Sequence, residues 1–471
     1  MKTFFTFITL SLFSSGTFAT GLNGHDLSLY FSIPFIGILL SIALMPLFLS
    51  RLWHYHYGKI IAIWTLLFLF FTFYFFGLQP TIDLTVHAII VEYIPFILLL
   101  LALFTVSGGI LIKSEVISTP KLNVGLLAIG TLLASIMGTT GAAMLMIRPL
   151  IRANRQRQHA THTIIFFIFL VANIGGGLTP LGDPPLFIGF LKGVNFTWTV
   201  RHMLLPVLLN AILLLAIYYV IDNYYFRQQY GKIQANILMS KPHPVKVYGK
   251  FNIILLIAIV IGVLLSGIWQ SSVSFSFLGV NIALQNLVRD GMFMLISLIS
   301  IVITPKQVRA GNEFNWDAII EVAKLFIGIF ITIVPVIAIL RAGSNGALAP
   351  LVSFVTSEQG NPINGRYFWL SGLLSGFLDN APTYLVFFNL ASGDANILMI
   401  TMAKTLLAIS MGSVFMGALS YIGNAPNVMI KCIATQHKIN MPSFFGYMKW
   451  SVTILIPLFI INHLLFFNEL A

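Results

Sequence analysis

The chain has 471 residues, of which 58% are hydrophobic and only 8% are charged, whereas soluble globular proteins carry about 25% charged residues. This composition excludes a cytosolic enzyme, because apolar runs fill nearly the whole sequence and leave no room for a separate soluble domain. The net charge of +12 does not indicate a nucleic-acid partner, since the Lys and Arg residues lie in short connections between apolar runs. The single cysteine, Cys432, excludes an internal disulfide and a cysteine-based metal cluster.

The N-terminal residues 1–19 have the layout of a secretory signal peptide. Lys2 precedes a short apolar stretch from Phe4 to Phe13, and the segment ends in Thr17-Phe18-Ala19. This stretch is shorter than the roughly 20 apolar residues that a membrane span needs. We therefore expect cleavage after Ala19, with a retained anchor as the alternative, and in both cases the following residues begin outside.

Two sets of apolar runs follow, divided by a basic connection. The first set comprises residues 30–50, 59–78, 88–112, 122–150, 162–191 and 203–226. The second set comprises residues 251–269, 286–304, 318–340, 366–392, 398–430 and 444–467. The connection, residues 231–250, is predicted to be a cytoplasmic linker because cytoplasmic loops carry an excess of Lys and Arg.

One run in each set is predicted to enter the membrane and return to the same side. Residues 122–150 have basic residues at both ends, and their centre is the polar, helix-breaking cluster 137–141 (Met-Gly-Thr-Thr-Gly). Irregular backbone at membrane depth is tolerated only where it is buried in protein or lines a cavity. Residues 366–392 have the same design around 379–383 (Asp-Asn-Ala-Pro-Thr). Both runs are therefore interpreted as re-entrant hairpins.

With these hairpins set aside, each half has about five true spans. An odd number of spans places the second half upside down relative to the first. The distribution of basic residues agrees with this topology, because most of them lie in the connections assigned to the cytoplasm. The outer connections hold only Lys192, Arg201, Arg289, Arg341 and Arg366.

An internal repeat supports the same organisation. At an offset of 241 residues, 138–141 aligns with 379–382, and 178–185 (LTPLGDPP) aligns with 419–426 (LSYIGNAP). The later motifs place Gly and Pro inside long apolar runs, and inverted repeats with paired broken helices are typical of secondary transporters. The alternative, that these clusters merely kink packed helices, does not explain the shared offset.

The predicted fold is an all-α polytopic membrane protein made of two inverted repeats, residues 20–230 and 251–471. Each repeat contains about five transmembrane helices, one re-entrant hairpin and one broken helix.

Several segments resemble the ion transporter superfamily, which includes carboxylate symporters and the D-type bacterial sodium:proton antiporters. Residues 172–183 (ANIGGGLTPLGD) are similar to the antiporter pattern of a Gly-rich helix that ends in a Ser/Thr-Pro-Ile-Gly-Asp break, and residues 378–382 are similar to the second hairpin tip of that group. Residues 30–59 resemble a bacterial family labelled either citrate transporter or sodium:proton antiporter. The resemblance implies a scaffold domain and a transport domain, elevator-type movement, a homodimer, and a multi-pass position in the bacterial inner membrane.

The candidate transport site lies where the hairpin tips and the broken helices meet. Ionisable residues inside a membrane are costly and are functional candidates by default, and hard cations prefer oxygen ligands. The candidate cation-binding residues are Thr139, Thr140, Thr179, Asp183, Asp379, Asn380, Thr383, Ser420 and Asn424, with Asp183 and Asp379 as the sodium ligands. The candidate backbone breaks are Gly138, Gly141, Gly182, Pro184, Pro382, Gly423 and Pro426.

Competition between sodium and a proton for one buried carboxylate is sufficient for antiport, so sodium:proton antiport is the favoured function and no resident cofactor is expected. The alternative is sodium- or proton-coupled symport of citrate or a dicarboxylate. It is less favoured because the carboxylate symporters place Ser-Asn-Thr at both tips, and neither motif here contains an Arg or Lys. The expected partners are the lipid bilayer and small inorganic cations or a small carboxylate. No enzyme motif for metal-assisted or serine hydrolysis appears.

Three further residues carry open alternatives. Asp183 precedes Pro184 and is also suited to act only as the cap of a helix. Glu92 is a candidate for a proton path or for a position at the outer interface. Lys404 is expected to extend to the interface.

Overall fold

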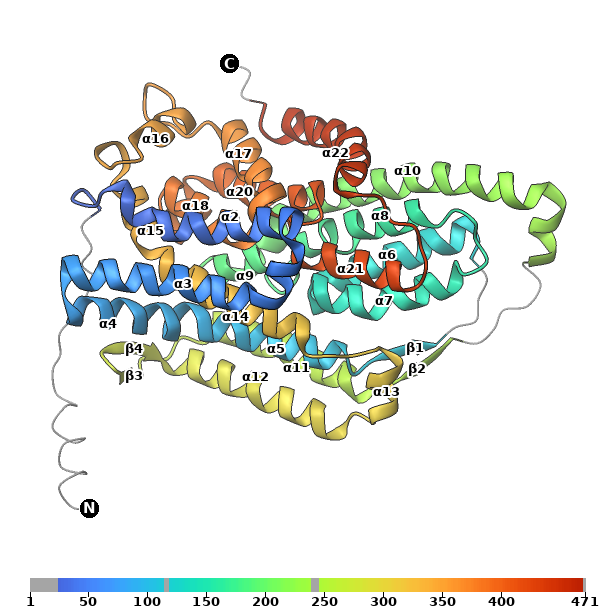
Figure 1. Ribbon diagram of the computed structural model, residues 1–471, viewed down its shortest axis with the longest axis horizontal. Helices are drawn as coiled ribbons and strands as arrows, with labels where there is room; N and C mark the ends of the chain where they lie inside the picture. The colour runs from blue at the N-terminus through green and yellow to red at the C-terminus, as the bar shows by residue number, and fades with distance from the viewer. Residues whose placement is uncertain (1–23, 114–117, 239–244, 469–471) are drawn as a thin grey trace.

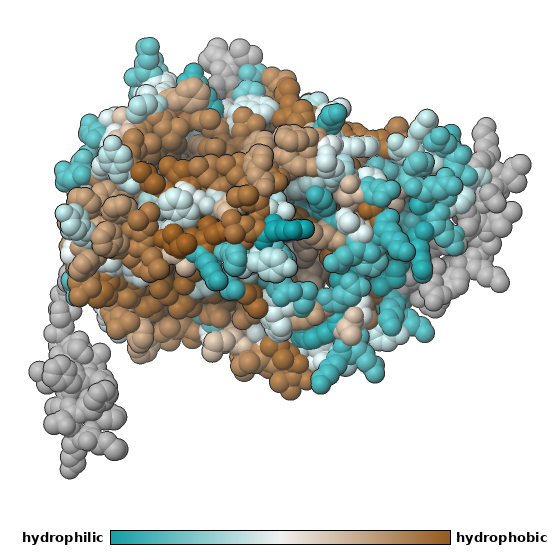
Figure 2. Space-filling model, viewed as in Figure 1, coloured by the Kyte–Doolittle hydropathy of each residue, from teal (hydrophilic) through white to brown (hydrophobic). Residues whose placement is uncertain are grey.

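The computed structural model describes residues 24–113, 118–238 and 245–468, which are mostly helical (Figure 1). In these ranges eight helices are long and apolar enough to cross a membrane, or nine if the bent segment 317–341 counts as one span. Figure 2 shows apolar residues over the face formed by the N-terminal helices and hydrophilic residues gathered toward one end of the molecule. The chain is therefore a multi-pass membrane protein. The predicted signal peptide, residues 1–19, lies outside the described residues.

The helices and short strands alternate along the chain as follows. The first half contains η1 (Leu29–Ser32), α2 (Ile33–Phe48), α3 (Ser50–Phe76), α4 (Leu78–His87), the π-helix η2 (Ala88–Tyr93), α5 (Ile94–Ser107), β1 (Leu111–Lys113), α6 (Pro120–Met137), α7 (Thr139–Ala153), α8 (Thr161–Leu170), η3 (Ile174–Gly177), α9 (Pro184–Leu191) and α10 (Phe196–Leu238). The second half contains β2 (Lys246–Tyr248), α11 (Phe251–Ile268), β3 (Ser274–Phe277), β4 (Val280–Ala283), α12 (Leu284–Ile303), α13 (Lys306–Gly311), α14 (Asp317–Thr332), α15 (Val334–Arg341), η4 (Gly343–Asn345), α16 (Ala349–Val355), α17 (Asn364–Leu378), α18 (Asn380–Ala391), α19 (Ala395–Ile400), α20 (Ala403–Phe415), η5 (Met416–Leu419), α21 (Ala425–Gln436) and α22 (Phe444–Phe466).

The helices pack as two sets. The N-terminal set comprises α2 to α5 with η2, α11, α12 and α14, which pack mainly against one another. The hairpin set comprises α6 to α10 and α17 to α22, which surround the broken segments at η3 and η5. The sets meet where α5 contacts α7, where α2 contacts α17 and where α15 contacts α18.

Both runs interpreted as hairpins do fold into pairs of antiparallel helices. The start of α6 lies beside the end of α7, because the backbone N–H of Ser118 donates to the carbonyl of Ala153 at 2.9 Å. The rings of Tyr367 and Phe387, on α17 and α18, lie 6.3 Å apart. The turn of the first hairpin is Gly138, with φ of 78°, and the turn of the second is Asp379, with φ of 82°.

The boundaries predicted for the second and third runs, 59–78 and 88–112, were wrong. Helix α3 already begins at Ser50, and α4 begins at Leu78, directly after a turn at Gly77 with φ of 85°. Polar side chains lower the hydropathy of residues 79–87, yet the backbone there is helical. The tight turn needs only one residue with positive φ, which Gly adopts without steric cost.

Two further differences concern elements that hydropathy does not report. Helix α10 continues to Leu238, so it extends into the segment predicted as a linker. Two small antiparallel sheets are also present. Strand β1 pairs with β2, with Lys113 opposite Lys246, and β3 pairs with β4 as a hairpin. The all-α prediction did not include these strands.

The third span of each half is irregular just before a proline. Pro95 cannot donate a backbone hydrogen bond and disturbs the preceding turn, and the residues before it form the π-helix η2. Pro335 lies in the first turn of α15, and α14 and α15 are bent by 41° around Ile333. Helical segments of the π type occur frequently at functional sites, which makes η2 a segment of interest.

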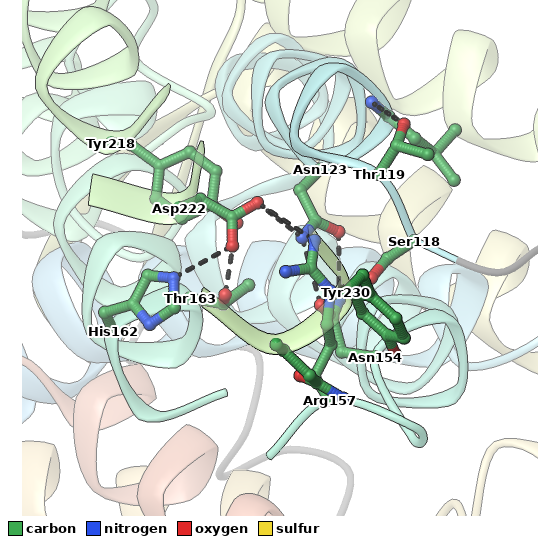
Figure 3. Close-up of polar contacts among 12 residues, drawn as sticks. Ser118, Thr119, Asn123, Asn154, Arg157, His162, Thr163, Tyr218, Asp222 and Tyr230 are labelled. Carbon is green, nitrogen blue, oxygen red and sulfur yellow. Dashed lines mark hydrogen bonds and ion pairs between the residues drawn. The ribbon is translucent and has the colours of Figure 1, made fainter. Parts of the chain in front are cut away.

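A buried charged cluster ties the open end of the first hairpin to α8 and α10 (Figure 3). Asp222 on α10 accepts hydrogen bonds from Asn123 (3.2 Å) and from Arg157 (3.4 Å), and its other oxygen lies 3.0 Å from His162 Nε2. The side chains of Asp222 and Arg157 are only 1% and 3% exposed. A buried charge is very costly unless it is paired and hydrogen-bonded, so these contacts fix the base of the hairpin.

Replacing Asp222 by Ala is expected to destabilise the protein by about 3–5 kcal/mol, because Arg157 would remain buried without its partner. Thermal unfolding of the detergent-purified variant measures this loss. Asp83→Ala is the control, since the Asp83 carboxylate accepts one exposed hydrogen bond from Gln79, and its melting temperature should stay close to that of the parent. Equal melting temperatures for both variants would show that the cluster does not stabilise the hairpin.

Candidate functional site

Asp183 lies at the meeting point of the two hairpin tips and the two broken helices. One of its carboxylate oxygens accepts hydrogen bonds from Thr139 Oγ1 (3.1 Å) and from Asn424 Nδ2 (3.3 Å), and the other accepts from Asn380 Nδ2 (2.5 Å). These donors come from the first tip, the second break and the second tip. Asp183 is 2% exposed. A single buried carboxylate therefore connects segments from both halves of the chain.

The side chain of Asp183 does not cap the helix that follows it. Asp183 is the N-cap residue of α9 with extended backbone, and Pro184 occupies the first helical position. Its carboxylate nevertheless accepts no hydrogen bond from the backbone of α9. The alternative that Asp183 acts only as a cap is therefore wrong, since its oxygens face the hairpin tips instead.

Asp379 takes the capping role at the second hairpin tip. Its carboxylate accepts a hydrogen bond from the backbone N–H of Ala381 at 3.2 Å, at the start of α18. Its backbone, with φ of 82° and ψ of 139°, lies in a region that is open mainly to Gly and costs other residues about 1–3 kcal/mol. Gly138, at the first tip, has nearly the same backbone, with φ of 78° and ψ of 152°. An acid in place of Gly at such a strained position indicates a functional requirement.

Hydroxyl groups fasten each break to the neighbouring hairpin. Thr179 donates to the carbonyl of Ser135, and Ser420, located 241 residues later, donates to the carbonyl of Gly376, both at 2.5 Å. Each hydroxyl also accepts from the backbone N–H two residues further on. These hydroxyls satisfy backbone groups that the broken helices leave without helical partners.

The glycines of the breaks allow two backbone segments to touch. A Cβ atom at Gly182 would fall well inside van der Waals distance of the carbonyl oxygen of Gly176, and one at Gly423 would lie 2.6 Å from that of Gly417. At the first break the carbonyl of Gly182 in turn accepts from the backbone N–H of Thr139 at 2.8 Å. Close backbone approach thus requires Gly at both places.

The structure brings together some of the predicted site residues and separates others. Thr139, Asp183, Asn380 and Asn424 are in direct contact, and Asp379 adjoins them. Thr383 donates to the carbonyl of Asp379, and Thr179 and Ser420 bond to hairpin carbonyls. Thr140 is half-buried at the first tip and does not contact Asp183. The side chains of these last residues, Thr140, Thr179, Thr383 and Ser420, do not face the carboxylate.

The predicted helix breaks fall where the structure interrupts its helices. Gly138 and Gly182 have been described above with their contacts. The others take these positions: Gly141 in the first turn of α7, Pro184 and Pro426 in the first turns of α9 and α21, Pro382 in the first turn of α18, and Gly423 before α21. Pro is tolerated in a first helical turn because its missing N–H has no partner there.

Two buried asparagines were missed by the sequence reasoning. Asn173 donates to Asn427 Oδ1 at 2.9 Å and accepts from Asn424 at 3.3 Å. Asn427 donates to the carbonyls of Gly417 and Ser420, both at 2.9 Å. Both asparagines are fully buried. The available signal was an amide inside an apolar run beside each break, and a buried amide is expected to have hydrogen-bond partners.

The electrostatic character of the site is acidic. Within the described ranges, neither Asp183 nor Asp379 has a Lys, Arg or His partner in a hydrogen bond or ion pair. The same part of the chain contains no group of three or more His, Cys, Asp or Glu residues that could hold a metal ion. Carboxylate, hydroxyl and amide oxygens together suit a proton or a small hard cation.

Comparison with known families agrees with the membrane fold. A family model described as "Putative citrate transport" matches residues 24–467, which is nearly the whole chain. No curated protein matches the sequence. The family assigned from residues 30–59 by resemblance, under its citrate-transporter label, is thus confirmed. The chain belongs to the "Putative citrate transport" family.

Proposed function

We propose that the chain is a secondary active transporter that exchanges sodium for protons at Asp183. The observation that carries this proposal is the environment of that carboxylate. It is buried, it receives hydrogen bonds from both hairpin tips and from the second break, and it has no cationic side-chain partner among the described residues. A sodium ion or a proton would supply the missing positive charge.

The exchange follows from competition for one site. Burial favours the protonated form of a carboxyl group, whereas a bound cation favours the charged form. Asn380 and Asn424 now present amide N–H groups to Asp183, and rotation of either amide would present its carbonyl oxygen to a cation instead. If only the protonated or the sodium-bound carrier changes its accessible side, each cycle exchanges one ion species for the other.

The proposed architecture is a pair of inverted repeats with elevator-type movement of the hairpin set. It is supported by the backbone geometry that recurs at an offset of 241 residues, at Gly138 and Asp379 and at Asp183 and Asn424. The division of the helices into two sets also supports it. In this proposal both hairpins are re-entrant, and the protein is a homodimer in the bacterial inner membrane without a resident cofactor.

The second candidate is sodium- or proton-coupled symport of citrate or a dicarboxylate, which the description of the family favours. The amide and hydroxyl donors around Asp183 could bind a substrate carboxylate once Asp183 is neutralised. Two carboxylates would otherwise repel the anion, and no Lys or Arg in the described chain pairs with either of them. Antiport therefore remains the first proposal.

Transport in proteoliposomes that contain a pH-sensitive dye separates the two candidates. We expect added sodium to change the internal pH in the absence of citrate, because protons leave as sodium enters. Vesicles with Asp183→Asn protein are the control for leak. Uptake of radiolabelled citrate that depends on sodium, without a sodium-driven pH change, would favour the symporter.

A further inference from the structure

An ion pair links the two sets of helices at a distance from Asp183. Lys192 Nζ contacts Glu92 Oε1, and the two side chains are only 21% and 13% exposed. Lys192 directly follows α9, which has 8 residues and begins directly after Asp183. Asp183 and Lys192 therefore lie at opposite ends of one short helix, separated along its axis by roughly 12 Å.

The two members of the pair belong to different packing sets. Glu92 lies in η2, which packs against α4, α5 and α14, and the hydroxyl of Tyr93 donates to the carbonyl of Ala323 on α14 at 3.1 Å. Lys192 ends α9, which packs against α18 and α20. The irregular π-helical turn thus holds a carboxylate on the N-terminal set against the last residue of a half-helix in the hairpin set.

This pair favours one relative position of the two sets. Both charges are largely withdrawn from water, so removing one leaves the other poorly solvated and unpaired. Lys192 also lies at the C-terminal end of α9, where the helix dipole favours positive charge. A displacement of α9 along η2 by more than a few ångströms would separate the two groups. The contact can therefore exist in only part of a cycle in which the hairpin set moves.

We propose that the Glu92–Lys192 pair is a lock that holds α9, and with it Asp183, against the N-terminal set in one conformation of the transport cycle. The pair breaks when the hairpin set moves and forms again when it returns. This inference rests on the proposed function only in requiring that the hairpin set moves. It does not depend on which ion or substrate is carried.

The test measures the accessible side of the site with a single reporter cysteine. Thr140→Cys is introduced in a Cys432→Ser background, because Thr140 lies half-buried at the first hairpin tip. A membrane-impermeant thiol reagent is added to either side of oriented vesicles, and the ratio of the two labelling rates reports the conformational balance. Glu92→Gln and Lys192→Gln should each change this ratio by about tenfold, the effect of losing ~1.4 kcal/mol of preference for one state.

Three further variants make the test specific. The charge-swapped Glu92→Lys/Lys192→Glu protein and the charge-conserving Lys192→Arg protein should move the ratio back toward the parent value. Asp290→Asn is the matched control, because Asp290 is 14% exposed and pairs with Arg289 on its own helix, α12. It should leave the ratio unchanged.

The outcomes separate the lock from the transport proposal. Parental ratios in both single variants, or equal shifts in Glu92→Gln and Asp290→Asn, would overturn the lock. Labelling requires no transported ion, so a shifted ratio that the charge swap restores would support the lock even if sodium did not exchange for protons. Exchange with an unchanged ratio would overturn the lock alone.

Discussion

Asp183→Asn is expected to reduce sodium:proton exchange to the level of empty vesicles while the protein still folds. The substitution removes the only titratable group that contacts both hairpin tips. All three of its hydrogen-bond partners are donors, so the new amide N–H would at first face a donor. Rotation of the Asn380 amide would restore a hydrogen bond, and the cost in stability should therefore stay near 1 kcal/mol. Proteoliposome exchange and thermal unfolding of the same preparation measure the two effects.

Asp379→Asn and Asp290→Asn place this result in context. An Asn at position 379 keeps a side-chain oxygen that can accept from Ala381, and Asn tolerates positive φ better than most residues, so this variant should also fold. We expect it to lose exchange, because the second tip would no longer carry an acid beside the Asp183 site. Asp290→Asn should exchange as the parent does. Parental rate and pH dependence in Asp183→Asn would show that the carrier is Asp379 or Glu92 instead.

The positions of the helix breaks could be predicted from the sequence because their signal is local. Gly, Pro and Asp inside an apolar run are costly in a membrane helix, and an offset of 241 residues aligns the clusters. The predicted hairpin centres, 137–141 and 379–383, contain the observed turns at Gly138 and Asp379. The limits of α3 and α4 could not be predicted in this way, since a single Gly turn leaves almost no polar connection to detect.

The partners of each oxygen could not be predicted, because they depend on side-chain direction in the folded state. Thr139 and Thr179 are the same residue type in equally interrupted runs, yet Thr139 faces Asp183 and Thr179 faces the carbonyl of Ser135. The two acids show the same limitation. Asp183 has the sequence context of a helix cap, but Asp379 makes the capping hydrogen bond. Tertiary contacts between segments from the two halves decide these roles.

Gly182→Ala is expected to prevent correct assembly of the first break. The added Cβ would overlap the carbonyl oxygen of Gly176, which belongs to the backbone and cannot rotate away as a flexible side chain would. Overpacking commonly costs about 1–3 kcal/mol, and here the shift would also disturb the hydrogen bond from Thr139 to Gly182 and the position of Asp183. The yield of monodisperse protein and its melting temperature should both fall.

Two other glycines test this explanation. Gly423→Ala should have a similar effect, since its Cβ would lie 2.6 Å from the carbonyl oxygen of Gly417, whereas a Cβ at Gly125 on α6 meets nothing within 4 Å. Gly125→Ala should therefore be neutral or stabilising by up to about 1 kcal/mol, because Ala has the higher helix propensity. If Gly182→Ala melted like Gly125→Ala, the backbone at the break would be able to open, and Asp183 would be held by its side-chain hydrogen bonds alone.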